Sequence, residues 1–190
     1  MTKETHFAVF ETAIGPCAVA WGSRGVLAVL LPERSEAATR ARLLRKVPDA
    51  LEAPPPPDVR RAVDGIVALL SGEARDLSGV ALDMEEVPAF NRRVYAIARA
   101  IGPGRTLSYG EIARRLGDPG LARDVGQALG RNPFPIVVPC HRVVAAGGKL
   151  GGFSARGGTA TKLRLLEIEG ALAAEAPTLF ADLPRAVRRA

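Results

Sequence analysis

The strongest constraint on the fold of this 190-residue chain is a change of pattern near Val87-Pro88. Before that point the chain opens with three strand-sized apolar runs separated by glycine-containing turns, at residues 7–10, 16–21 and 26–31. After it, apolar residues recur at the three- and four-residue spacing that is typical of helices. We therefore expect an N-terminal α/β domain at residues 1–86, a mostly helical C-terminal domain at residues 87–170, and a tail at residues 171–190.

Four further elements are expected in the first domain: helices at 35–46 and 59–70, an extended connection at 54–57, and a last strand at 77–84. No residues in this domain have catalytic spacing. Cys17 lies in an apolar run, which favours a small buried side chain over a reactive one. His6 and Cys17 alone cannot form a zinc site.

Charge separates the same two domains. Residues 1–86 include 10 basic and 13 acidic side chains, a net charge of −3, whereas residues 87–170 include 13 basic and 5 acidic side chains, a net charge of +8. Positive charge gathered in one domain is expected of a protein that binds phosphates. A solvated arginine-rich surface would give the same count, so charge alone leaves both interpretations open.

The second domain contains a helix at 91–101 and then two shorter helices. Ser108 and Glu111 have the spacing of a capping box, which predicts a helix that begins there and ends at Gly117. After the turn at 118–120, a second helix is expected at 121–130. Two short helices joined by a Gly/Pro turn in a basic domain predict a helix-turn-helix.

The second short helix has small residues on one face, because Ala122, Gly126 and Gly130 are spaced four apart. A glycine inside a helix costs about 1 kcal/mol relative to alanine, so such a stripe indicates close approach of something bulky. Tight packing on another helix and contact with a nucleic-acid groove fit this pattern equally well.

Cys140 stands in the most informative segment, Pro139-Cys140-His141-Arg142-Val143. Positively charged neighbours favour the nucleophilic thiolate form of a cysteine. A histidine adjacent in sequence often points away from the thiol, so it would act through a water. The alternative is a structural thiol at the end of a buried strand.

The segment at 139–143 follows Asn-Pro-x-Pro-Ile at 132–136 and a Ser-Tyr-x-x-Ile-Ala helix at 108–113. In this combination the chain resembles the O6-alkylguanine-DNA alkyltransferases, also called methylated-DNA–protein-cysteine methyltransferases, most densely over residues 87–170. The resemblance implies an α+β fold. It consists of a small N-terminal α/β domain with an antiparallel, ribonuclease H-like sheet, then a helical C-terminal domain that contains a helix-turn-helix.

The resemblance also implies a mechanism. Members of the family flip an alkylated guanine out of duplex DNA and transfer its alkyl group to a cysteine, which is not regenerated. Cys140 matches the acceptor, His141 the residue that deprotonates it through a water, and Glu169 the acid that orients this histidine. Asn132 matches a hinge residue whose side chain helps to hold the site.

Other positions match residues that contact DNA or the flipped base. Arg123 matches the arginine that enters the base stack in place of the flipped guanine, and Tyr109 the tyrosine that helps to rotate the nucleotide and donates to guanine N3. In the family the second helix lies in the minor groove, which would explain its stripe of Ala122, Gly126 and Gly130.

Three residues match the family's substrate pocket. Ser154 corresponds to a serine near guanine O6, and the Val143 carbonyl would accept from the exocyclic amine. Phe153 stands where many relatives have tyrosine, which keeps an apolar wall without the hydroxyl. The implied partner is double-stranded DNA that contains O6-alkylguanine, and no metal or cofactor is implied.

Three alternatives make different predictions. A non-catalytic alkyltransferase-like DNA-binding protein would lack the acceptor, whereas Cys140 is present. A helix-turn-helix regulator would not need Asn132, Cys140, His141 and Glu169 together. A cysteine hydrolase normally has a histidine far along the chain from its cysteine, and the other histidine here is His6.

The N-terminal residues 1–6 lack a basic segment followed by a long apolar run, so a signal peptide is not expected. The apolar run at 25–31 is far too short to span a membrane. We expect a soluble, cytoplasmic monomer that does not associate with membranes.

Overall fold

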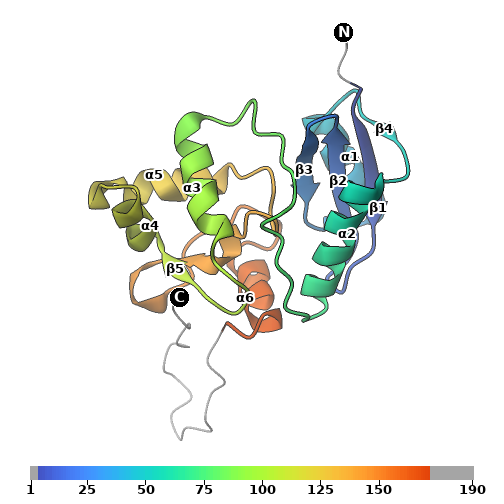
Figure 1. The fold of residues 1–190 in the computed structure, drawn as a ribbon. Coiled ribbons are helices and arrows are strands. Elements are labelled where there is room, and N and C mark those ends of the chain that lie inside the picture. Colours follow the sequence, from blue (N-terminus) through green and yellow to red (C-terminus); the bar gives the residue numbers. More distant parts are fainter. Residues whose placement is uncertain (1–3, 172–190) are drawn as a thin grey trace, which may run out of the picture. The chain divides into compact units, whose positions relative to one another are not determined.

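The computed structural model describes residues 4–171, which form two compact units (Figure 1). Within the described residues, the first unit contains 4–88 together with 132–138, and the second contains 89–131 together with 139–171. Segment 132–138 was expected in the second domain. It groups instead with the first unit, to which it is joined by a hydrogen bond from the Val29 N–H to the Pro133 carbonyl at 2.9 Å. Of the expected tail, 172–190 lie outside the described residues.

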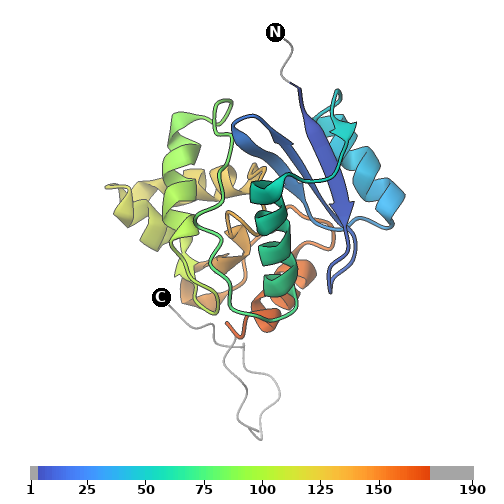
Figure 2. The same cartoon turned by 45° about the vertical axis from the view of Figure 1, so that its right-hand side comes forward.

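The first unit is built on a four-stranded sheet in the order β3-β2-β1-β4 (Figure 2). Its strands are β1 (His6–Phe10), β2 (Cys17–Gly22), β3 (Gly25–Leu30) and β4 (Leu51–Glu52). β2 pairs antiparallel with both β1 and β3, which confirms the antiparallel sheet expected from the three apolar runs. β4 pairs parallel with β1 and was not foreseen, since two residues give no detectable periodicity.

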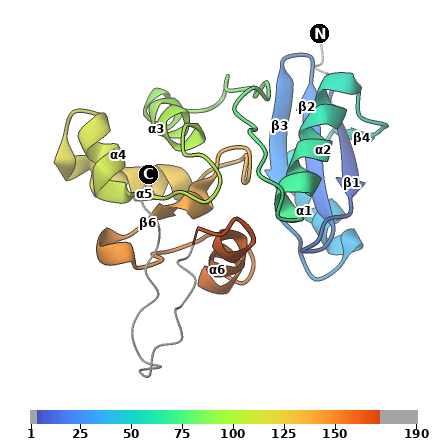
Figure 3. The same ribbon diagram turned by 60° about the horizontal axis from the view of Figure 1, so that its bottom comes forward.

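Helices α1 (Glu36–Lys46) and α2 (Pro57–Leu70) lie on opposite faces of this sheet (Figures 1 and 3). Ser35 caps α1, since its hydroxyl accepts from the Ala38 N–H at 3.2 Å. Leu43 of α1 is fully buried in the core cluster with Phe7 and the inward-facing alanines of β2 and β3. Both helices confirm the ranges expected from their spacing to within two residues.

The expected strand at 77–84 is wrong. Only Leu82 forms an isolated parallel bridge, with Val26. Local side-chain hydrogen bonds compete with strand pairing on both sides of it: the Asp76 carboxylate accepts from the Ser78 N–H at 2.8 Å, and the Asp83 carboxylate accepts from the Glu85 N–H at 3.1 Å. These turns interrupt the run of extended residues.

Cys17 is completely buried in β2. Burial raises the pKa of its thiol to about 12, although the nearby Thr12 hydroxyl, 3.7 Å from Sγ, opposes this. The thiol is therefore protonated at neutral pH and inaccessible. This confirms the expectation that Cys17 is a buried packing residue.

The second unit is mostly helical. Its helices are α3 (Ala89–Arg99), α4 (Tyr109–Arg115), α5 (Ala122–Gly130) and α6 (Thr159–Ile168). Single 3-10 turns occur at η1 (Pro119–Leu121), η2 (Cys140–Arg142) and η3 (Ala146–Gly148). Two short strands, β5 (Leu107–Ser108) and β6 (Val143–Val144), pair in parallel.

The capping box at the start of α4 is confirmed, since Ser108 Oγ accepts from the Glu111 N–H and the Glu111 carboxylate accepts from the Ser108 N–H. α5 begins after η1, one residue later than expected. The buried Tyr95 hydroxyl of α3 donates to the Ala128 carbonyl at 2.9 Å, which joins α3 to α5. No helix within residues 4–171 is long and apolar enough to cross a membrane.

Candidate active site

Cys140 begins η2, a single 3-10 turn that follows Pro139 and leads directly into β6. Cys140 therefore lies in a turn and not at the end of a strand, where the structural alternative had placed it. The residue is 8% exposed, whereas His141 is completely buried and Arg142 is 5% exposed. The turn thus leaves the cysteine at the edge of solvent while its two basic neighbours lie inside the unit.

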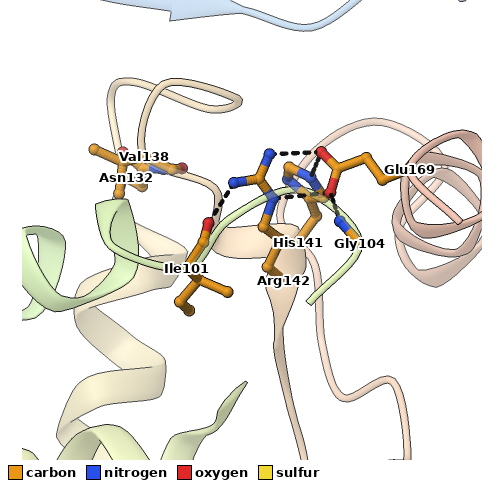
Figure 4. Close-up of polar contacts among 7 residues, drawn as sticks. All are labelled: Ile101, Gly104, Asn132, Val138, His141, Arg142 and Glu169. Atoms are coloured by element: carbon orange, nitrogen blue, oxygen red, sulfur yellow. Dashed lines mark hydrogen bonds and ion pairs between the residues drawn. The ribbon is translucent and has the colours of Figure 1, made fainter. Parts of the chain in front are cut away.

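Behind the cysteine, three charged or ionisable side chains form a buried cluster (Figure 4). His141 Nε2 lies 2.9 Å from Glu169 Oε1, so the two share a hydrogen bond. Arg142 donates from Nε to Glu169 Oε2 and from Nη2 to Oε1, both at 2.8 Å, and its Nη1 donates to the Ile101 carbonyl. Glu169 follows α6 directly, so this cluster joins α6 to η2 and to the end of α3.

The electrostatics of the cluster follow from burial and from these bonds. Burial opposes the charged form of Glu169, but the hydrogen bonds from His141 and Arg142 outweigh it and lower the pKa to about 2. Burial lowers the pKa of His141 against the opposing influence of Glu169. At neutral pH the site therefore contains a carboxylate and a neutral imidazole. His141 Nδ1 is buried without a hydrogen-bond partner in the described part of the chain.

Gly104 shows how closely the chain approaches Glu169 from the other side. Its N–H donates to Glu169 Oε2 at 3.5 Å. Its φ is 74°, and a Cβ there would lie 3.0 Å from the Glu169 carbonyl oxygen. Only glycine adopts this conformation readily in so little space, and it lets the backbone supply a further donor to the carboxylate.

Cys140 lines a pocket of about 540 Å³ in the second unit. One wall comes from α5, and others come from the start of α4 and the loop that precedes α6. The lining residues are Tyr109, Ala122, Arg123, Gly126, Leu129, Gly130, Cys140, Gly152, Phe153 and Ser154. A pocket of this size is in the range that accommodates small-molecule ligands.

The small-residue stripe of α5 faces this pocket. A Cβ on Gly126 would meet the Tyr109 ring at 3.8 Å, and a Cβ on Gly130 would have no described atom within 4 Å. The buried face of α5 is a different one, formed by Val125, Ala128 and Leu129. Among the described residues, Gly126 faces Tyr109 at the start of α4 at an ordinary contact distance, and Gly130 faces open space, which favours the groove interpretation over tight packing on another helix.

Comparison with known proteins agrees with this geometry. The family model for the DNA-binding domain of 6-O-methylguanine DNA methyltransferase matches residues 89–171. The methylated-DNA–protein-cysteine methyltransferase of Methanothermobacter thermautotrophicus is 38% identical over 152 residues, which are 80% of this chain and 78% of that protein. The protein of the same name from Mycobacterium tuberculosis is 38% identical over 178 residues, which are 92% of this chain and 98% of that protein.

The chain belongs to the methylated-DNA–protein-cysteine methyltransferases. Solved structures agree: the M. tuberculosis O6-methylguanine methyltransferase has a TM-score of 0.70 at 35% identity and covers 90% of this chain and 96% of its own. The M. tuberculosis protein in complex with DNA has a TM-score of 0.65 at 35% identity, and the match covers 86% of this chain and 92% of that one. The mixed α+β fold with an antiparallel sheet is thereby confirmed.

The methyltransferase structure brings together most of the residues expected at the site. Tyr109, Arg123, Phe153 and Ser154 line the pocket with Cys140 and the α5 stripe, and His141 and Glu169 contact each other behind it. Val143 is fully buried, and its carbonyl accepts from Lys162 Nζ at 2.6 Å. A carbonyl oxygen has two lone pairs, so this contact leaves one acceptor position.

Asn132 is placed differently, because by its contacts it belongs to the first unit. Its amide donates to the Val138 carbonyl at 2.8 Å (Figure 4). Its side-chain oxygen accepts from the Phe134 N–H at 2.9 Å. These bonds close a tight loop in which Ile136 has a φ of 73°. That conformation costs a non-glycine residue about 1–2 kcal/mol, so the loop depends on such bonds.

Lys162 lies next to the pocket residues Gly152 and Tyr109 of this methyltransferase without lining the pocket, and the sequence analysis missed it. It is completely buried in α6, with Nζ 2.6 Å from the Val143 carbonyl, 3.3 Å from the Gly152 carbonyl and 5.7 Å from the centroid of the Tyr109 ring. Burial lowers its pKa to about 8, while Cys140 opposes the shift. One signal was available: Lys162 precedes the buried Leu165 and Leu166 at helical spacing, so it interrupts an apolar face.

Proposed function

We propose that this methyltransferase repairs double-stranded DNA by direct transfer of a methyl or other alkyl group from O6 of guanine to Cys140 Sγ. One observation carries the proposal: the 540 Å³ pocket that contains Cys140 is bordered by α5 and by Tyr109, and a neutral, carboxylate-bound histidine lies behind it. A nucleophile, a base and a cavity large enough to admit a purine base thus belong to one unit.

The chemical step has a simple balance. The thiolate attacks the alkyl carbon, so that a C–S bond forms while the bond from that carbon to O6 breaks and its electron pair passes to the guanine. The thiol proton passes through a water to His141, whose buried Nδ1 has a free lone pair in the neutral form that donates from Nε2. The departing guanine takes up a proton in turn. No group regenerates the thiol, so each molecule acts once.

Glu169 supports this proton transfer by orienting the base. Its hydrogen bond to Nε2 fixes the imidazole tautomer that leaves Nδ1 available to accept the proton. Tyr109 would donate to guanine N3 and assist rotation of the nucleotide, while Ser154, Phe153 and the Val143 carbonyl would contact the base. Asn132 would hold the cysteine loop through its bonds to the segment at 132–138.

DNA would bind through α4 and α5 acting as a helix-turn-helix, with α5 in the minor groove. The open stripe of Ala122, Gly126 and Gly130 allows a duplex to approach closely, and the exposed Arg123 in the first turn of α5 would fill the position of the flipped guanine. The first unit would be a ribonuclease H-like support. A monomer suffices, because every residue in these roles comes from one chain.

The test is to mix the protein with a duplex that contains O6-methylguanine and to analyse its peptides by mass spectrometry. We expect one methyl group on Cys140 and none on Cys17, with stoichiometry that saturates at one per chain. Repeated turnover, or folded protein that binds the duplex without accepting a methyl group, would contradict the proposal. The second result would indicate a DNA-binding protein without transfer activity.

Replacing Gly130 by leucine tests the role of the stripe. The free protein should keep its stability or gain up to about 1 kcal/mol, because no described atom lies within 4 Å of the new Cβ and leucine favours helix more than glycine does. Duplex repair should slow at least tenfold, because the side chain would project toward the DNA. Urea unfolding and single-turnover repair rates measure the two effects.

A free O6-alkylguanine base is the control substrate for Gly130→Leu. It needs no groove contact, so its transfer rate should change much less than that of the duplex. A variant that repairs duplex at the wild-type rate would show that this face of α5 does not meet DNA.

A further inference from the structure

Arg142 is the one residue of the buried cluster for which the proposed mechanism has no task. Its guanidinium donates to both oxygens of Glu169 and to the Ile101 carbonyl, and the residue is only 5% exposed. A bidentate arginine–carboxylate pair of this kind is strong and geometrically fixed. Removing such a group from water is costly, so its presence beside the base calls for a physical reason.

The charge of Glu169 creates a difficulty that Arg142 can resolve. A carboxylate that is hydrogen-bonded to a buried histidine favours the protonated imidazole. A histidine that already has both protons cannot accept one from a thiol. For His141 to serve as a base, Glu169 must orient the ring without holding a second proton on it.

We propose that Arg142 is a positioning residue of the transfer reaction, which neutralises Glu169 so that this carboxylate orients His141 while the imidazole stays free to accept a proton. The inference rests on the proposed function. It assigns to the arginine of the Pro-Cys-His-Arg segment a task separate from that of its neighbours.

The charged groups around His141 agree with this assignment. Glu169 favours its protonated form, through both the hydrogen bond and the charge. Arg142 on the same turn and Lys162 on α6 both oppose protonation, and burial opposes it most strongly. Cys140, the adjacent residue, completes the set. One carboxylate thus faces two cations, and only Arg142 contacts that carboxylate directly.

The two histidines of the chain allow a direct test by NMR on histidine-labelled protein. His6 lies in β1 of the first unit and serves as an internal reference, and His6→Gln assigns the signals. In the wild-type protein His141 should take up its proton at a lower pH than an ordinary histidine. If the wild-type His141 is already protonated at pH 7, the proposal is overturned, whatever the variants do.

The informative variants are Arg142→Gln, which removes the positive charge, and Arg142→Lys, which keeps the charge but cannot form the same bidentate pair with Glu169. In Arg142→Gln the titration of His141 should move up by about one pH unit or more. The acid limb of the single-turnover repair rate should move up with it. In Arg142→Lys, His141 should stay neutral at pH 7, with repair within about tenfold of wild type.

A purely structural arginine gives a different pattern. Both variants would then lose stability and repair rate together, with no change in the titration of His141. That result in a folded Arg142→Gln overturns the proposal, and so does a folded Arg142→Lys in which His141 is protonated at pH 7. Since the titration needs no DNA, it also separates this inference from the proposed function, whose own failure would appear as absent transfer with the titrations as expected.

Discussion

Replacing Cys140 by alanine should abolish alkyl transfer completely. The cysteine supplies the only sulfur that lines the pocket, and the second cysteine, Cys17, is fully buried in the sheet of the first unit with a thiol that stays protonated. No other described side chain in the pocket is a comparable nucleophile at neutral pH. Incubation with a duplex that contains O6-methylguanine, followed by mass spectrometry of the intact protein, should show no added methyl group.

The same variant should still bind DNA, because no contact proposed for the duplex involves the thiol. We expect its affinity for the modified duplex to remain within about threefold of wild type in a titration at fixed salt. Cys17→Ala is the matched control, and it should retain full transfer stoichiometry even if it is somewhat less stable. Methyl transfer to Cys140→Ala at any appreciable level would show that the acceptor lies elsewhere.

Local sequence signals predicted those elements whose causes are local. The Ser108–Glu111 capping box, the helix expected at 35–46 and the three first strands all depend on residues close together in the chain, and all are present. The strand predicted at 77–84 is absent because this segment forms a single isolated bridge, and the side chains of Asp76 and Asp83 stabilise turns on either side of it. Pairing partners distant in the chain are not encoded in the periodicity of one segment.

The residues of the candidate site likewise fall into those that a local sequence motif identifies and those that it does not. The Pro139–Val143 segment identified Cys140 and its neighbours, because the informative residues are adjacent. Sequence alone could not indicate that Arg142 binds Glu169 27 positions away, or that Lys162 reaches the Val143 carbonyl. These contacts depend on where α6 packs. A lysine or arginine on an otherwise apolar face indicates burial with partners but does not identify them.

Arg123→Ala should have the second-largest effect, and that effect should depend on the substrate. Arg123 is exposed in the first turn of α5 and borders the pocket. We expect its guanidinium to occupy the space that the flipped base leaves and so to offset part of the few kcal/mol that unstacking costs. Without it, the single-turnover rate on duplex DNA should fall about 100-fold. A free O6-alkylguanine base needs no flipping, so its transfer rate should fall less than threefold.

Loss of one positive charge must be separated from loss of the intercalating group. Arg92→Ala removes the same charge from an exposed position of α3 in the same unit, and it should lower the duplex rate only slightly and in a salt-dependent way. The Arg123→Ala deficit should persist at higher salt and shrink on a duplex with a mismatch opposite the lesion, where less stacking and pairing energy is lost on flipping. If the transfer rate fell equally on duplex and on free base, Arg123 would act on the reaction in the pocket and not on base flipping. If higher salt removed the deficit, Arg123 would only contact a DNA phosphate.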